Sequence, residues 1–252
     1  MVANHGYPSE THEITTDDGY IITLFRIPHG INDDGAAKRP PILLMHGFGV
    51  CSGEFVSLGP ERGLGFILAD AGYDVWLANT RGTAFSRKHT TIDPDLNPEQ
   101  FFNYTWHEIA IYDVANSIDY ILDVNGDDSV YYVGHSQGTT VFLVLASTKP
   151  EYNSKIRVAN LMAPAAIIKH YPSTLIQGIC KYVDRVWSLL QKYRIYEIPL
   201  LGTLRETVTT LCANYPDEES DPLCAMIHDS ILSRVDEVSF KSSTYGDCLR
   251  EF

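Results

Sequence analysis

The sequence has no long hydrophobic run, few basic residues and few cysteines. None of its apolar stretches approaches the roughly 20 residues that a membrane-spanning helix needs, so we expect no transmembrane segment. Its 19 Lys and Arg residues stand against 32 Asp and Glu residues, giving a net charge of −13. This charge argues against nucleic acid or an anionic membrane as a partner, but it is compatible with neutral lipids.

Signals for the cellular compartment are also sparse. Residues Met1–Pro8 contain neither a basic stretch nor an apolar core, so no signal peptide is visible. Five cysteines are too few for a disulfide scaffold, although the four in the last third would suit one or two bridges in a secreted protein. Asn103 begins the only Asn-x-Ser/Thr triplet and is the candidate glycosylation site.

Short apolar runs alternate with helical patterns through the first 164 residues. Residues 13–27 read as two strands around a turn at Asp17-Asp18-Gly19, and Phe85–Asn103 is polar enough to be surface loop. Thr105 and Glu108 have the spacing of a helix capping box. The other expected strands are Pro41–Met45, Tyr73–Ala78, Ser129–Val133 and Ile156–Met162, and the other expected helices are Leu64–Ala71 and Thr139–Thr148.

This alternation predicts an α/β fold with a mostly parallel central sheet. Residues 1–164 are expected to form its core. The character of the sequence changes after Pro164, because Ile167–Phe252 show helical periodicity and no convincing strand. Residues 165–252 are therefore predicted to be a helical insertion or cap.

One serine has the surroundings of a catalytic nucleophile. Ser136 lies in the motif Gly134-His135-Ser136-Gln137-Gly138, which an expected strand enters and an expected helix leaves. The residues that flank such a tight turn must be very small, and Gly134 and Gly138 meet that need. The N-terminus of the following helix would favour negative charge beside the serine.

Acyl transfer also needs hydrogen-bond donors for the oxyanion. The amide of Gln137 is one candidate, and the amide of Phe48, in the loop after the Pro41–Met45 strand, is the other. His46 begins this loop, and we interpret it as a residue that orients the loop, because the base of this fold follows the serine in sequence. His135 is expected to pack beneath the loop.

The motifs resemble the acid lipase family of α/β-hydrolases, which includes gastric and lysosomal acid lipases. The segments that carry the resemblance are Gly6–Glu10, Thr16–Tyr20, Arg26–Gly30, Met45–Phe48, Leu68–Leu77, Asn79–Gly82 and Tyr132–Thr140. The resemblance implies hydrolysis of hydrophobic carboxylic esters, such as acylglycerols or sterol esters, at a lipid–water interface. It implies Ser136 as nucleophile, no metal or organic cofactor, and a secreted or lysosomal location. It further implies a cap disulfide between Cys212 and Cys224.

The remaining members of a catalytic triad are not evident. The family pattern continues beyond Phe252, and the matching aspartate and histidine would lie there, so we expect the chain to be C-terminally incomplete, with the last strands of the sheet missing. His170 and His228 are the only histidines after Ser136, and neither follows an expected strand. We therefore expect weak or no turnover from this polypeptide alone.

Two other functions remain open at the level of sequence. The first is a non-catalytic lipid-binding or interaction protein that kept the serine motif and lost the triad. The second keeps the fold with a different substrate, as in a thioesterase or peptidase, because the motif alone does not exclude it.

Overall fold

The computed structural model describes residues 1–33, 35–166, 183–192, 194 and 196–197. Met1–Ala166 belong to one compact unit, and Ile167–Gly246 form a second. In the second unit the described helix is α7, Val183–Lys192. The predicted division into a core (1–164) and a cap (165–252) stays a prediction, because most of the latter region lies outside the described residues.

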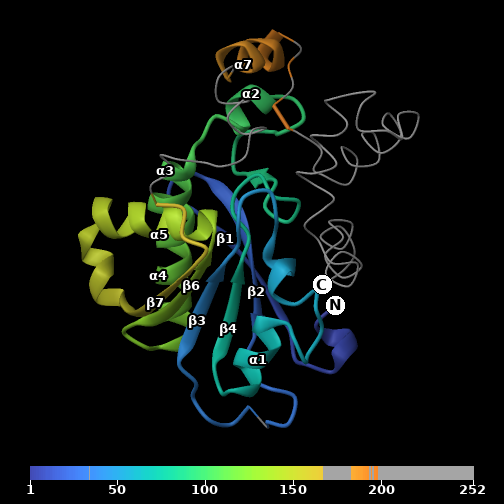
Figure 1. Ribbon diagram of the computed structural model, residues 1–252, viewed down its shortest axis with the longest axis vertical. Helices are drawn as coiled ribbons and strands as arrows, with labels where there is room; N and C mark the ends of the chain where they lie inside the picture. The colour runs from blue at the N-terminus through green and yellow to red at the C-terminus, as the bar shows by residue number, and fades with distance from the viewer. Residues whose placement is uncertain (34, 167–182, 193, 195, 198–252) are drawn as a thin grey trace, which may run out of the picture. The chain divides into compact units, whose positions relative to one another are not determined.

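The first unit is built on one sheet, and its described strands are β1 (Glu10–Thr15), β2 (Tyr20–Ile27), β3 (Pro41–Met45), β4 (Asp74–Ala78), β5 (Lys88–His89), β6 (Val130–His135) and β7 (Ile156–Met162). Their order is β1-β2-β4-β3-β6-β7 (Figure 1). β5 lies off this path and pairs with β2. The strands β4, β3, β6 and β7 run parallel, and β1 and β2 add an antiparallel edge. The predicted mostly parallel α/β sheet is confirmed.

The helices that accompany the sheet are α1 (Leu64–Asp70), α2 (Pro98–Phe101), α3 (Trp106–Glu108), α4 (Ala115–Asn125) and α5 (Gln137–Thr148). The 3-10 turns among the described residues are η1 (Ala3–His5), η2 (Ser52–Phe55) and η4 (Pro150–Lys155). The predicted capping box is present, since Glu108 accepts from the Thr105 amide at 2.7 Å and the Thr105 hydroxyl accepts from the His107 amide at 3.1 Å. A π-helical segment, η3 (Ile109–Val114), then joins α3 to α4.

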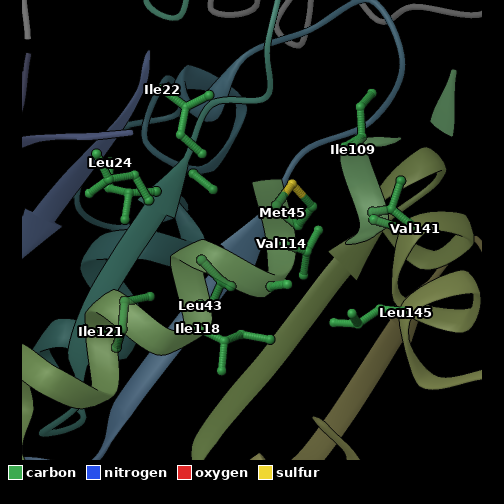
Figure 2. Close-up of a cluster of buried hydrophobic side chains, with 14 of the residues drawn as sticks. Ile22, Leu24, Leu43, Met45, Ile109, Val114, Ile118, Ile121, Val141 and Leu145 are labelled. Atoms are coloured by element: carbon green, nitrogen blue, oxygen red, sulfur yellow. The ribbon is translucent and has the colours of Figure 1, made fainter. Parts of the chain in front are cut away.

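Buried strand β3 divides two hydrophobic clusters. Leu43 and Met45 join the cluster that contains the inner faces of α4 and α5 (Figure 2). Ile42 and Leu44 point the other way, into the cluster that contains α1. Because successive side chains of a strand point to opposite faces, a strand covered on both faces must be apolar throughout. This explains the uninterrupted apolar sequence of β3.

The expectation of surface loop over residues 85–103 is wrong for part of the segment. It contains β5 and α2, and Phe101 at the end of α2 is fully buried. The Phe101 ring packs on that of Tyr20 with centroids 5.1 Å apart, and the Tyr20 hydroxyl donates to the Phe101 carbonyl. The buried Phe101 ring and the pairing of β5 with β2 both hold this polar, proline-containing segment against the sheet.

Candidate active site

Ser136 occupies a sharp turn between β6 and α5. Its backbone has φ 49° and ψ −111°, a conformation that non-glycine residues rarely adopt. The Ser136 amide donates to the carbonyl of Met162, at the end of β7, at 2.9 Å. The neighbouring strand therefore holds the turn in a strained geometry of the kind found at functional sites.

The two glycines of the motif are required by backbone contact. A Cβ atom on Gly138 would lie 2.3 Å from the carbonyl oxygen of Met45, on the adjacent strand β3. A Cβ atom on Gly134 would lie 2.7 Å from the carbonyl of Gly138. Both distances are far below van der Waals contact, so no larger residue fits without moving the backbone. The sequence-based requirement for very small residues is met for this reason.

The loop after β3 lies beside Ser136. β3 and β6 are parallel neighbours, with Met45 opposite Gly134, so their C-terminal ends meet. A Cβ atom on Gly47 would lie 3.4 Å from the Cβ of Ser136. Phe48 comes next in a turn, and the residue is 81% exposed. Gln137 is the first residue of α5. The structure thus brings the Phe48 and Gln137 segments together at the serine.

His46 fixes the path of this loop. Its Nδ1 lies 2.8 Å from the Gly47 carbonyl oxygen, and its Nε2 lies 3.2 Å from the Thr80 amide. These contacts suit the neutral tautomer that donates from Nδ1 and accepts at Nε2. Complete burial lowers the pKa of His46 to about 4, so the ring is uncharged near neutral pH. The geometry agrees with a loop-orienting histidine and leaves no free nitrogen for a base.

Glu54 is a site residue that the sequence analysis missed. It lies in η2, where one carboxylate oxygen accepts from the Gly47 amide at 3.3 Å and the other lies 3.2 Å from Nδ1 of His135. Burial raises the pKa of Glu54, and the neighbouring His135 opposes this rise. His135 contacts this loop as expected, but it is not covered by it, because its side chain is 40% exposed. Glu54 and His135 lie 81 residues apart, and no local pattern marks the pair.

The other residues that the sequence analysis considered are only partly described. Asn103 is exposed just after α2. Cys51, one of the five cysteines and not a predicted site residue, precedes η2 and is disulfide-bonded. Cys212, Cys224, His170 and His228 lie outside the described residues. Within the described ranges, no group of three or more His, Cys, Asp or Glu side chains could hold a metal ion. None of the described helices is long and apolar enough to cross a membrane.

Comparisons with known proteins agree with this architecture. Residues 1–59 match the model of a partial alpha/beta-hydrolase lipase region, and residues 40–178 match that of the alpha/beta hydrolase fold. Among solved structures, an esterase of Pyrococcus furiosus is similar in fold, with a TM-score of 0.50 at 15% identity over 77% of this chain and 66% of that one.

Two curated relatives are closer in sequence. Lipase 1 of Drosophila melanogaster is 46% identical over 214 residues, which cover 84% of this chain and 47% of the relative. Gastric triacylglycerol lipase of Bos taurus is 44% identical over 174 residues, which cover 69% of this chain and 43% of the relative. The chain spans about half the length of such relatives. With the fold, the serine turn and these similarities in place, the chain belongs to the α/β-hydrolase family and, within it, is similar to lipases that include gastric triacylglycerol lipase.

Proposed function

We propose that this chain carries the nucleophile part of a lipase that hydrolyses lipid carboxylic esters, with Ser136 as nucleophile. The observation that carries the proposal is the strained Ser136 turn, fixed between two glycines that cannot be enlarged and beside the loop after β3. The name of the gastric triacylglycerol lipase supports acylglycerols as the substrate class, and sterol esters contain the same type of bond.

In the proposed reaction the Ser136 oxygen attacks the ester carbonyl carbon and the alcohol departs, leaving an acyl-enzyme that water hydrolyses. The backbone amides of Phe48 and Gln137 would donate to the oxyanion that forms at each step. The serine proton needs a histidine base that a carboxylate orients. His46 is engaged on both ring nitrogens and does not serve as that base.

The same proposal extends to the protein's surroundings. A lipase acts at a lipid–water interface, and the family resemblance supports a secreted or lysosomal location. There Asn103, which is exposed, would be available for glycosylation, and Cys212 and Cys224 would form a disulfide.

Reaction with a fluorophosphonate tests the nucleophile directly. The Ser136 oxygen forms a bond to phosphorus, fluoride leaves and the serine proton passes to solvent. Oxyanion donors would stabilise the charge that develops on the phosphonyl oxygen, so slow labelling should be measurable even where ester turnover is weak. We expect stoichiometric labelling of the purified chain and none of Ser136→Ala. A folded wild-type chain that resists labelling would contradict the proposal and favour a non-catalytic lipid-binding protein.

A further inference from the structure

Gly47 is the residue whose backbone decides where the Phe48 amide points. The Gly47 carbonyl and the Phe48 amide belong to one planar peptide unit, so fixing the first fixes the direction of the second. A glycine, however, has no side chain to restrict its two backbone dihedrals. Something other than Gly47 itself must therefore hold this part of the loop.

Two side chains hold the two peptide units around Gly47. His46 donates from Nδ1 to the Gly47 carbonyl at 2.8 Å, which orients the unit that contains the Phe48 amide. Glu54 accepts from the Gly47 amide at 3.3 Å, which orients the preceding unit. Together the two contacts restrain both φ and ψ of Gly47.

The second carboxylate oxygen of Glu54 ties this arrangement to the serine turn. It lies 3.2 Å from Nδ1 of His135, the residue directly before Ser136. A Cβ atom on Gly47 would lie 3.2 Å from that same Nδ1, so the two segments are in direct contact. Glu54 thus contacts both the Gly47 amide and the residue before the serine.

Placing the Glu54 carboxylate in this partly buried position costs free energy of hydration. The Glu54 side chain is only 18% exposed, and a carboxylate in that position loses much of its hydration. A glutamate that served only to fill space in η2 could be replaced by an apolar residue without this cost. Unlike an apolar residue, the Glu54 carboxylate makes hydrogen-bond contacts with the Gly47 amide and with Nδ1 of His135.

We propose that Glu54 is a positioning residue that sets the direction of the Phe48 amide relative to Ser136, acting through Gly47 and His135. The inference rests on the proposed function, because it assigns Glu54 to the alignment of an oxyanion donor. Glu54 itself does not contact the reacting atoms.

The test uses the rate of Ser136 labelling by a fluorophosphonate, measured over reagent concentration in the full chain. Misplacement of a catalytic group by about 1 Å can cost about 100-fold in rate. We expect Glu54→Ala to lower the maximum labelling rate by about 10-fold or more, with little change in the half-saturating concentration, because donor alignment acts on the step that forms the bond. Glu54→Gln keeps an acceptor for Gly47 and should recover most of the rate.

Glu61→Ala is the matched control, since Glu61 is an exposed glutamate a few residues further along the chain. It should label like the wild type. Glu54→Met keeps the volume without either contact and decides the question if Glu54→Ala does not fold. A maximum rate in folded Glu54→Ala or Glu54→Met equal to that of the wild type would overturn this inference alone. An unlabelled wild-type chain would instead overturn the proposed function and this inference with it.

Discussion

The loops that follow β3 and β4 are neighbours in the sheet but are held in different ways. After β4, the Arg81 guanidinium is buried and binds the carboxylates of Asp18 and Asp113 at 2.6 to 2.9 Å. Its charge also lies 3.9 Å from the centre of the Tyr20 ring. After β3, the path of the chain depends on single contacts from His46 and Glu54, and the Phe48 side chain is largely in solvent.

The contacts after β4 stabilise the fold, whereas the contacts after β3 mainly orient the backbone. Removing Arg81 or one of its two carboxylate partners should destabilise the fold strongly, because the charges that remain are then uncompensated in a poorly hydrated site. The loop after β3 is fixed by contacts of about 1 kcal/mol each, which are enough to orient a backbone amide but contribute little to the free energy of folding. The loop after β4 therefore serves as the anchor, and His46 joins the loop after β3 to it through the Thr80 amide.

The largest change in stability is expected from substitution of Arg81 in the loop after β4. Arg81→Met leaves Asp18 and Asp113 without their buried partner and should lower the free energy of unfolding by about 3–5 kcal/mol, measured with urea near neutral pH. Arg87→Met is the control: it removes an exposed pair with Asp95 and should cost less than about 1 kcal/mol. If Arg81→Met lowered the free energy of unfolding by less than about 1 kcal/mol, the loop after β4 would contribute no more to stability than the loop after β3.

The same variant has a defined dependence on pH. Burial raises the pKa of Asp113 to about 6, and Arg81 opposes that rise. Without Arg81 the pKa should be higher still. A carboxyl with a raised pKa in the folded state is stabilising only while protonated, so stability is lost as pH rises through that pKa. The deficit of Arg81→Met should therefore be smaller at pH 5 than at pH 8.

An intermediate effect is expected at the contact between the serine turn and β3. Replacing glycine by alanine inside a helix ordinarily stabilises it by about 1 kcal/mol. Gly138→Ala should do the opposite and destabilise by about 1–3 kcal/mol, because its Cβ would meet the Met45 carbonyl at 2.3 Å. Labelling of Ser136 should be lost at the same time. A stabilised variant that still labels would show that the turn is looser than its geometry implies.

The smallest change in stability is expected from protonation of His46, which connects the two loops. Its folded pKa of about 4 lies below the ordinary value of 6.5, so its contribution to stability is complete above 6.5 and is lost as pH falls towards 4. At pH 5.5 the wild type should lose about 1 kcal/mol from this group. His46→Gln should lack that component, which the difference between the two urea titrations over pH 4.5–7.5 would show.

Local patterns in the sequence predicted most of the fold. The bounds of β3 and β7 are as expected from their apolar runs, and the Thr105 capping box is present. The strand–serine–helix order also predicted the turn at Ser136, because each of its parts is adjacent in sequence. These features share one property, which is that all the residues that define them lie within a few positions of one another.

The features that could not be predicted depend on pairs far apart in the chain. Arg81 meets Asp18 across 63 residues and Asp113 across 32, and the π-helical turn η3 contains Asp113. Glu54 meets His135 across 81 residues. A single sequence read locally contains no sign of such partners, since a lone charged residue is more often solvated than paired.

The backbone of Ser136 ties its chemistry to assembly of the sheet. Nothing within the serine favours φ 49°; the conformation exists only when β3 approaches Gly138 and β7 accepts the Ser136 amide. A chain in which these strands have not come together has an ordinary serine at this position, with ordinary reactivity. A reagent for Ser136 would therefore count correctly assembled molecules in a preparation, which makes labelling stoichiometry a gauge of folding yield as well as of catalysis.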